Sequence, residues 1–218
     1  MILYIYCAGG FGKEIMDVAR RKNKISQQWT EIKYIDDVFT EKFKYGSEVL
    51  SLNNLITAVD HNEAEFIIAN GEPHIRKNIR EKLVKNNYKL GKLVDVSTMV
   101  ADTANIADGV IVTPMCSISS DAKLSKNSCV NTMSIIGHDV IIGENSVISS
   151  MVNMGGACTV GENSYIGMGA LVKEGVKIGA NSIVGMGSVV YNDVPDDVIA
   201  LGNPARVVRK NTDQKVFK

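Results

Sequence analysis

Three histidines, His61, His74 and His138, are the side chains of this sequence best suited to move a proton near neutral pH. An unperturbed imidazole has a pKa of about 6.5, so it can serve as a general base under these conditions. His138 is followed directly by Asp139, and a nearby carboxylate can fix the imidazole tautomer and stabilise the imidazolium. His61 lies in a polar run typical of a solvated loop, and His74 stands near an expected helix start. The His138–Asp139 pair is therefore the leading candidate for acid–base chemistry.

Four cysteines are the other candidate reactive side chains. They are Cys7, Cys116, Cys129 and Cys158. They are scattered along the chain without the C-x-x-C spacing that metal and redox sites use. We interpret them as reduced packing residues of a cytosolic protein, with neither a disulfide nor a metal among them.

A glycine-rich segment, AGGFG at 8–12, joins an expected buried strand to an amphipathic helix at 13–21. Glycines between a strand and a helix let backbone N–H groups approach an anion at the helix N-terminus. A second strand at 32–35 ends in Asp36 and Asp37, where an open parallel sheet binds a ribose or a base. The spacing is not a full G-x-G-x-x-G, so a tight turn without a ligand remains the alternative to a nucleotide site.

The elements that would carry this segment alternate between strands and helices. Strands are expected at 2–7, 32–35 and 65–69, and helices at 13–21, 52–58 and 74–87. Pro73 is well placed at the start of the last helix. This βαβαβα order predicts a small parallel sheet with right-handed crossovers.

A six-residue repeat runs through the second half of the chain. Every sixth residue from Val94 to Val190 is Val, Ile, Leu or Met, over seventeen positions without interruption. Many of these aliphatic residues are followed three positions later by Gly, Asn or Asp, which tolerate the positive φ of a sharp corner. A period of six fits neither an α-helix nor a simple strand. It predicts a solenoid of short parallel strands that turns every six residues and stacks the aliphatic side chains inside.

Motifs in both halves resemble one family along nearly the whole chain. They are YCAGGFGKEI, YIDD, IANGEPHIRKNI, SIIGHDVIIGENS and the terminal DVPDDVIALGNPARVVRK. The chain is similar to the PglD-type and perosamine-type nucleotide-sugar N-acetyltransferases, and to the related NeuD-type sialic acid O-acetyltransferases, all hexapeptide-repeat acyltransferases. The resemblance implies a Rossmann-like α/β domain at 1–90, a left-handed parallel β-helix at 91–194, and a C-terminal loop and tail at 195–218.

The resemblance also implies a binding site in the N-terminal domain for the nucleotide of a sugar substrate. Its residues would be Gly9, Gly10, Phe11, Asp36 and Asp37. The chain departs from the family at two positions, since Cys7 stands where relatives often carry glycine and Phe11 where some carry histidine. Because Phe11 offers no polar contact, the sequence leaves the base open among uridine, thymidine and guanosine.

In the β-helix, the resemblance implies that His138 is the general base and Asp139 its acidic partner. Some relatives carry a second histidine nine residues after the base, where this chain has Val147. The backbone N–H of Gly156, one coil from His138, is the candidate donor to the oxyanion. The residues expected beside acetyl-CoA are Val147, Gly156, Met168 and Met186. The resemblance further implies a homotrimer in which the coenzyme arm runs between neighbouring β-helices and each active site is shared by two chains.

The leading hypothesis is an acetyl-CoA-dependent N-acetyltransferase for the 4-amino group of a nucleotide-linked 4-amino-4,6-dideoxy sugar, in bacterial polysaccharide or glycoprotein biosynthesis. Sugar O-acetylation of the sialic acid type is the alternative. A zinc-dependent hydratase needs three histidine ligands, and His138 alone lies within the repeat, so no metal is expected. The remaining class is a non-catalytic protein that binds sugar nucleotides, and the His138–Asp139 pair argues against it.

Composition limits the partners of the chain. Its 24 Lys and Arg balance 24 Asp and Glu, which gives a formal net charge of zero and does not favour nucleic-acid binding. No apolar run approaches the roughly 20 residues that span a bilayer, and the first residues lack the basic region of a signal peptide. We therefore expect a cytoplasmic protein without a membrane partner.

Overall fold

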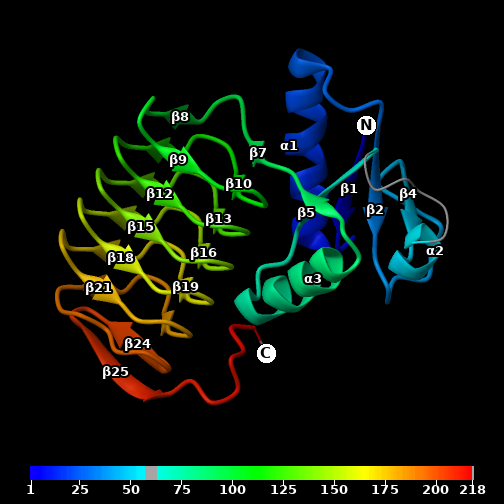
Figure 1. Cartoon of the computed structure of the whole chain (residues 1–218). Coiled ribbons are helices and arrows are strands. Elements are labelled where there is room, and N and C mark those ends of the chain that lie inside the picture. The colour runs from blue at the N-terminus through cyan, green and yellow to red at the C-terminus, as the bar shows by residue number, and fades with distance from the viewer. Residues whose placement is uncertain (57–62, 218) are drawn as a thin grey trace.

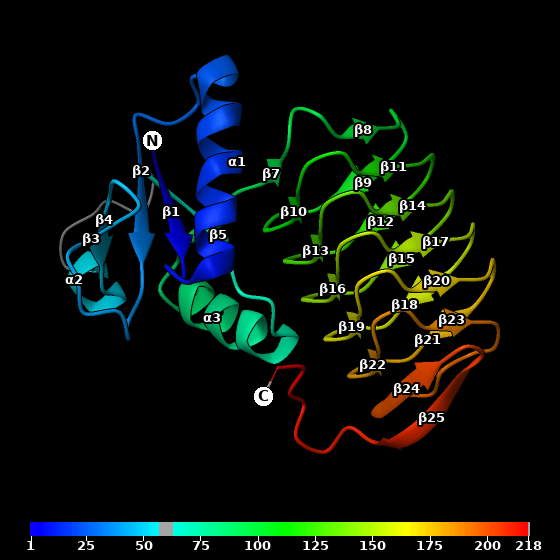
Figure 2. The ribbon, with the colours of Figure 1, turned by 180° about the vertical axis from the view of Figure 1, so that it is seen from behind.

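The computed structural model describes residues 1–56 and 63–217 as two parts that lie side by side (Figure 1). One part is an α/β domain built on a parallel sheet, and the other is a stack of coils made of very short strands. A view from behind shows the same division (Figure 2). The expected fold class, a small α/β domain followed by a left-handed parallel β-helix, is confirmed. Within the described residues, no helix is long and apolar enough to cross a membrane.

The N-terminal domain contains one six-stranded sheet in the order β3-β4-β2-β1-β5-β6. The strands are β1 (Ile2–Tyr6), β2 (Glu31–Ile35), β3 (Phe43–Lys44), β4 (Ser47–Leu50), β5 (Ala64–Ile68) and β6 (Lys89–Leu90). Neighbouring strands pair in parallel except β3 and β4, which form an antiparallel hairpin at one edge. The helices are α1 (Gly10–Ser26), α2 (Leu52–Ile56) and α3 (Pro73–Lys85).

The order of strands and helices agrees with the sequence, whereas several ends differ. Helix α1 begins at Gly10, inside the glycine-rich segment, and ends at Ser26, so it is much longer than 13–21. The last residues of the helix expected at 52–58 lie outside the described residues. The β3–β4 hairpin is not among the expected elements, and its turn at Tyr45 and Gly46 has positive φ at both residues.

The β-helix has three faces, each a parallel sheet. The first face contains β7 (Leu93–Val94), β10 (Ile111–Val112), β13 (Cys129–Val130), β16 (Val147–Ile148), β19 (Tyr165–Ile166) and β22 (Ile183–Val184). The second contains β8 (Met99–Val100), β11 (Ser117–Ile118), β14 (Ile135–Ile136), β17 (Asn153–Met154), β20 (Leu171–Val172) and β23 (Val189–Val190). The third contains β9 (Asn105–Ile106), β12 (Lys123–Leu124), β15 (Ile141–Ile142), β18 (Thr159–Val160) and β21 (Lys177–Ile178). An antiparallel hairpin of β24 (Val198–Gly202) and β25 (Ala205–Lys210) extends the first face.

The six-residue repeat explains this architecture. The aliphatic residues of the repeat fill the inside of the coils, as Ile136, Ile142 and Ile148 show with none of their surface exposed. The corner residues adopt positive φ, which confirms the role expected for Gly, Asn and Asp. Met133 and Met151 also adopt φ near +60° at corners, although side chains of this kind rarely favour that conformation.

The N-terminal domain packs against the first face of the β-helix. Outward side chains of that face, such as Ile111 and Val147, are buried in one cluster with Leu3, Ile15 and Met16 of the N-terminal domain. Figures 1 and 2 both show α1 and α3 on this side of the coils. The burial of this apolar surface fixes how the two parts sit relative to each other.

Arg76 of α3 forms the polar centre of this contact. Its guanidinium is fully buried and donates hydrogen bonds to the carbonyl oxygens of Ile68, Asn70 and Asn127, and to the Oδ1 atom of Asn127. Within the described chain it forms no salt bridge with a carboxylate. Asn127 begins a ladder of side-chain amides that runs down one corner of the β-helix. Its members are Asn127, Asn145, Asn163 and Asn181, and the last amide donates to Asp197.

Candidate active site

His138 lies in the turn between β14 and β15, at the corner of the second and third faces. Its side chain is 69% exposed, so the imidazole points away from the packed interior. The Nδ1 atom lies 2.8 Å from Oδ2 of Asp139, whose φ of 60° directs the carboxylate back toward the ring. With Nδ1–H donating to this carboxylate, Nε2 keeps a free lone pair and can accept a proton. The two residues therefore have the geometry of a general base and its orienting carboxylate.

Gly156 lies against the imidazole from the next coil. A Cβ atom on this glycine would stand 2.3 Å from Nε2 of His138, so only glycine leaves room for the ring. The backbone of the same turn is fixed by a 2.7 Å hydrogen bond from the N–H of Ala157 to the carbonyl oxygen of His138. Among the residues described, the N–H of Gly156 has no hydrogen-bond acceptor. A free backbone donor beside a base is the arrangement that an oxyanion-stabilising site requires.

The glycine-rich segment opens α1 at the carboxyl edge of the sheet. Gly9 is the N-cap residue and supplies no side-chain cap, and both Gly9 and Gly10 are exposed with open space where a Cβ would be. The first N–H groups of a long helix therefore face solvent, as in sites that bind phosphate. Gly12 has a different role, because its Cβ would lie 2.2 Å from the carbonyl oxygen of Cys7. It permits the close approach of α1 to the end of β1.

The two aspartates after β2 lie at the same edge of the sheet and organise its loops. Asp36 accepts hydrogen bonds from the N–H groups of Ala8, Val38 and Phe39, so it holds the start of the glycine-rich segment. Asp37 accepts from the N–H of Leu52 and from the hydroxyl of Tyr6 at 2.5 Å. Desolvation, followed by the hydrogen bond to Asp37, raises the pKa of Tyr6 far above its ordinary value. Asp36 is half-buried, whereas Asp37 is exposed.

Cys7 and Phe11 are the two departures from the family at this edge. Cys7 adopts φ of 81°, the region that favours the glycine of the relatives, and its sulfur accepts a hydrogen bond from Asn70. Burial raises the pKa of the Cys7 thiol, which keeps the group neutral. Phe11 is half-buried and packs against the apolar core between the sheet and the β-helix. It therefore contributes more to packing than to the open edge.

The expected site residues form separate groups within one chain. Gly9, Asp36 and Asp37 lie together at the carboxyl edge of the sheet, whose domain covers the first face of the β-helix. His138 and Gly156 lie together at the opposite corner, between the second and third faces. Val147 is only 1% exposed and packs against the N-terminal domain, so it presents no surface within this chain.

Met168 and Met186 line a third location, a cavity of about 470 Å³ on the first face near the C-terminal hairpin. Its walls are mostly apolar and include Tyr165 and Leu201, together with the C-terminal residues Val216 and Phe217. Arg209, Asp213 and Lys215 add charges to its lining. A largely apolar cavity of this volume with a few charged groups suits a small-molecule ligand.

The remaining histidines and the cysteines show less of the geometry of a catalytic site than His138 does. His74 is in the first turn of α3, where its Nδ1 atom lies 3.7 Å from Glu72, and His61 lies outside the described residues. Burial raises the pKa of the Cys129 thiol to about 11, as expected for a packing residue. Across 1–56 and 63–217, no three His, Cys, Asp or Glu side chains gather in a group that could hold a metal ion.

Comparison with known proteins connects both parts of the chain to one class of enzyme. The family model of the PglD N-terminal domain matches residues 2–83, and the bacterial transferase hexapeptide model matches residues 157–192. The acetyltransferase domain of PglB from Neisseria gonorrhoeae, solved with acetyl coenzyme A, has 27% identity and a TM-score of 0.89, covering 95% of this chain and 98% of that one. The protein is a hexapeptide-repeat acetyltransferase with a PglD-type N-terminal domain.

Two further solved structures are similar to this protein along nearly its whole length. PerB from Caulobacter crescentus, solved with CoA and GDP-perosamine, has 25% identity and a TM-score of 0.87, covering 95% of this chain and 97% of that one. WeeI from Acinetobacter baumannii has 29% identity and a TM-score of 0.87, covering 95% of this chain and 100% of that one. The perosamine N-acetyltransferase was also solved with a substituted histidine.

The acetyltransferase also has cavity residues that the sequence did not single out. They are Tyr165, Arg209, Lys215 and Phe217. Tyr165 is an outward position of the repeat, Arg209 is in the terminal motif quoted above, and Lys215 and Phe217 lie in the tail beyond it. Their grouping depends on the path of the tail after β25, which a local pattern does not encode. A signal was nevertheless present, because the tail contains aromatic and basic residues after the repeat has ended.

Proposed function

We propose that this acetyltransferase transfers the acetyl group of acetyl-CoA to the 4-amino group of a nucleotide-linked 4-amino-4,6-dideoxy sugar. The observation that carries the proposal is the His138–Asp139 pair set against the free N–H of Gly156. Support for the substrates comes from PglB, solved with acetyl coenzyme A, and from PerB, solved with CoA and GDP-perosamine. The proposal places the domain boundaries at 90/91 and 194/195.

In this mechanism Nε2 of His138 takes the proton that leaves the amine as its nitrogen attacks the thioester carbonyl carbon. The carboxylate of Asp139 stabilises the imidazolium that results. The N–H of Gly156 donates a hydrogen bond to the oxygen that becomes negative in the tetrahedral intermediate. The C–S bond then breaks, the thiolate leaves, and it receives the proton from His138, which restores the neutral base.

The N-terminal domain would bind the nucleotide of the acceptor. The uncovered N-terminus of α1 at Gly9, Gly10 and Phe11 supplies backbone N–H groups for the diphosphate. Asp37 is exposed and can accept a hydrogen bond from the ribose or the base, while Asp36 holds the loop in place. Met168 and Met186 would contact the coenzyme along the cavity that they line.

A homotrimer would bring these groups together. The second face and its corner with the first face expose a stripe of large apolar side chains, which in a soluble protein marks an interaction surface. They are Met99, Met115, Met133, Ile135, Met151 and Leu171. Contact between copies through this stripe would bring the His138 corner of one chain near the N-terminal domain of its neighbour. Each active site would then be shared between two subunits.

The test is release of free thiol from acetyl-CoA in the presence of UDP-, dTDP- or GDP-linked 4-amino sugars. We expect turnover with one of these acceptors and none with its 4-hydroxy analogue. The variant His138→Asn should lower kcat by about 100-fold to 10,000-fold, since the general base is lost. Turnover of sialic acid acceptors alone would transfer the assignment to O-acetylation.

The corner residue of the preceding coil provides a matched control. Asp121 also has positive φ and an exposed side chain, but lies beside no histidine in the sequence. Asp139→Asn should lower kcat, whereas Asp121→Asn should leave it unchanged. Equal losses in both variants would show that the corner carboxylate acts on the fold rather than on the base.

A further inference from the structure

The C-terminal segment 211–217 crosses from the β-helix back to the N-terminal domain. It leaves β25 at Lys210 and ends beside the start of α3 (Figures 1 and 2). There the carboxylate of Glu72 accepts a 2.9 Å hydrogen bond from the N–H of Val216 and a 2.7 Å hydrogen bond from the N–H of Phe217. Glu72 is mostly buried, with 15% of its side chain exposed. Hydrogen bonds to a charged acceptor are the stronger kind, so this contact anchors the segment.

The ring of Phe217 also lies beside two other residues, Tyr165 and Gly71. It meets the ring of Tyr165 edge-on, with 5.7 Å between the centroids. A Cβ on Gly71 would lie 3.1 Å from the Phe217 ring, so the glycine leaves just enough space for it. Glu72 therefore holds both Val216 and Phe217 through polar contacts, and Tyr165 holds Phe217 through an independent aromatic contact.

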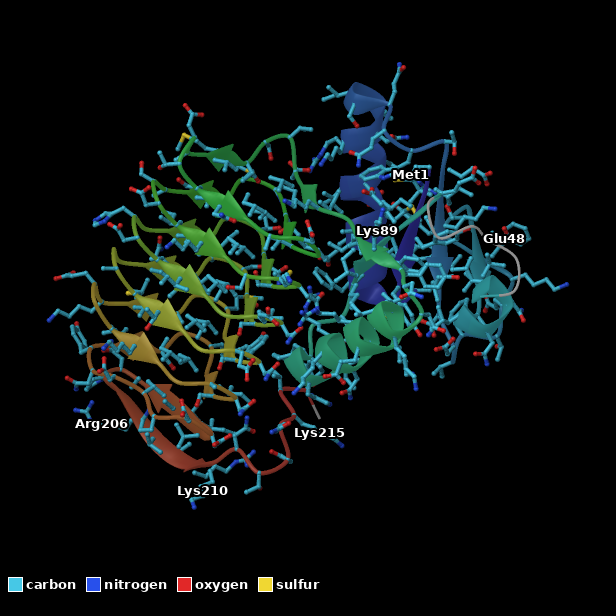
Figure 3. All side chains as sticks on the ribbon, viewed as in Figure 1. Met1, Glu48, Lys89, Arg206, Lys210 and Lys215 are labelled. Atoms are coloured by element: carbon cyan, nitrogen blue, oxygen red, sulfur yellow. The ribbon has the colours of Figure 1, made fainter. Side chains whose placement is uncertain are left out.

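This anchored segment forms one wall of the cavity that Met168 and Met186 line. Val216 and Phe217 complete the apolar part of the wall, and Lys215 adds a positive charge beside Arg209. Figure 3 shows Lys215 between α3 and the hairpin of β24 and β25. Asp213 also lines the cavity and pairs with Arg209 at 3.5 Å, so the lining combines apolar walls with two cations and one carboxylate. The net positive charge and the apolar walls suit the phosphate groups and flat base at the nucleotide end of a coenzyme.

We propose that segment 211–217 is a strap that completes the coenzyme cavity, and that Glu72 is the positioning residue that holds it in place. The proposal rests on the function proposed above, since it takes the occupant of the cavity to be acetyl-CoA. Glu72 touches no substrate in this proposal and acts only through the strap. It is the start of α3, in the N-terminal domain, that sets the shape of a cavity on the β-helix.

The experiment measures the Kd of CoA by calorimetry and the KM for acetyl-CoA in three variants. These are Glu72→Ala, a chain that ends at Asn211, and the combination of both. We expect Kd and KM to rise about tenfold in each, with kcat changed less than twofold, because the strap contributes to binding. Since Glu72 acts through the strap, the combined variant should bind CoA no more weakly than the truncated chain alone.

Two further variants make the test specific. Gly71→Val should raise Kd as well, because its side chain would displace the Phe217 ring without altering Glu72. Glu81→Ala removes an exposed carboxylate from the same helix α3 and should leave Kd unchanged. Trypsin should cleave after Lys215 faster in Glu72→Ala than in Glu81→Ala.

The outcomes separate this proposal from the proposed function. If the unaltered protein binds CoA and the Glu72→Ala and truncated variants bind it equally well, the strap proposal is wrong and the function stands. Additive losses from Glu72→Ala and truncation would also overturn it, since Glu72 would then act by another route. If the unaltered protein binds no CoA, the proposed function fails together with the coenzyme role of the strap.

Discussion

The imidazole of His138 occupies its position because the next coil carries a glycine beneath it. A methyl group at Gly156 would overlap Nε2 and Cε1 of the ring. Since His138 is exposed, the ring can swing outward, and the cost to folding is small. We expect Gly156→Ala to lower kcat about 100-fold, because a base displaced by about 1 Å loses its alignment.

The measurement pairs thiol release with thermal unfolding of the same variant. We expect the free energy of unfolding to fall by less than about 1 kcal/mol, at the low end of what single substitutions cost. Full activity at unchanged stability would show that the ring does not need its present place for catalysis.

Cys7 holds a backbone conformation that a glycine would adopt with less strain. Its φ of 81° lies in a region that L-residues rarely occupy. We expect Cys7→Gly to raise the free energy of unfolding by up to about 1 kcal/mol, since relief of strain outweighs the extra entropy of glycine in the unfolded chain. Urea unfolding measures the change, and Cys7→Ala should show no gain. A loss of stability in the glycine variant would mean that the hydrogen bond from Asn70 to the Cys7 sulfur contributes more to stability than the relief of backbone strain.

At this scale the sequence predicted what lies close along the chain. His138 and Asp139 are adjacent, so the pair and its orientation at a corner follow from the repeat alone. Gly156 is eighteen positions away, and the period places it against His138. The contact between Glu72 and Phe217 joins residues 145 positions apart, and no periodicity links them.

Among the elements, α1 is tied to the first coil by an ion pair between the half-exposed Arg21 and the buried Asp95. The Nε atom of Arg21 lies 2.9 Å from Oδ2 of Asp95, whose side chain has no exposed surface. Desolvation alone would raise the pKa of Asp95, but hydrogen bonds from Ser97 and the pairing with Arg21 outweigh it and hold the pKa below its ordinary value. The folded state therefore favours the ionised carboxylate.

This pair predicts an acid-sensitive contribution to stability. A depressed folded pKa gives stabilisation that is complete above the unfolded pKa of about 3.9 and is lost as pH falls through the folded value. We expect Asp95→Asn to reduce the free energy of unfolding at pH 6, and the difference from the unaltered protein to shrink below pH 4. Urea titrations across pH 3–6 measure it. A difference that stays constant with pH would exclude the linkage.

Among the contacts between elements, those of Arg76 should contribute most to the free energy of unfolding. Its removal leaves the buried carbonyl oxygens of Ile68, Asn70 and Asn127 without their donor. We expect Arg76→Met to lower the free energy of unfolding by about 3–5 kcal/mol, since leaving a buried acceptor without its donor costs roughly 1–3 kcal/mol and three acceptors are affected. Lys77→Ala, an exposed cation on the same helix, should change it by less than about 0.5 kcal/mol.

Element ends and edges were harder to predict from the sequence than element types. Helix α1 extends to Gly10 because the glycines face open space and need not form a separate loop. The β3–β4 hairpin has strands too short to show alternation, and its turn depends on positive φ at Tyr45, a residue that gives no turn signal. Tertiary contacts, such as the cation–π contact of Arg20 with the Tyr45 ring, hold it instead.

For the whole molecule, the decisive prediction concerns sites shared between chains. Gly10→Asp should fold, because the position is open and a carboxylate is favourable at a helix N-terminus, yet it should repel the diphosphate. This variant and His138→Ala should each be inactive. In the proposed homotrimer, random assembly of equal amounts of the two variants should regain about a quarter of full activity over all trimers, since an intact base meets an intact binding edge in about one third of the sites of each mixed trimer.

The mixing experiment requires co-refolding or co-expression, with thiol release as the readout. No recovery from trimers confirmed to be mixed would show that each chain supplies its whole site. The exposed stripe gives a second test, in which Met151→Glu should shift sedimentation toward the monomer and remove activity. A variant that stays trimeric would place the interface elsewhere.

The architecture of the molecule was predictable because the repeat is strict over its full length. The relative placement of the two domains was not, since it depends on Arg76, Asp95 and the outward side chains of the first face. Those outward positions lie next to the aliphatic positions of the repeat and recur only every eighteen residues. They are Leu93, Ile111, Cys129, Val147, Tyr165 and Ile183, an apolar series that the six-residue period does not single out.

The asparagine ladder gives one corner of the β-helix an electrical polarity. Every amide donates toward the C-terminal end, from Asn127 through Asn181 to the carboxylate of Asp197, while the guanidinium of Arg76 donates to the first amide oxygen. A single reversed amide would set two donors or two acceptors face to face. The ladder therefore reverses as a unit or not at all. A cation at its head and an anion at its foot select one of its two orientations, so docking of α3 at one end aligns dipoles along four successive coils.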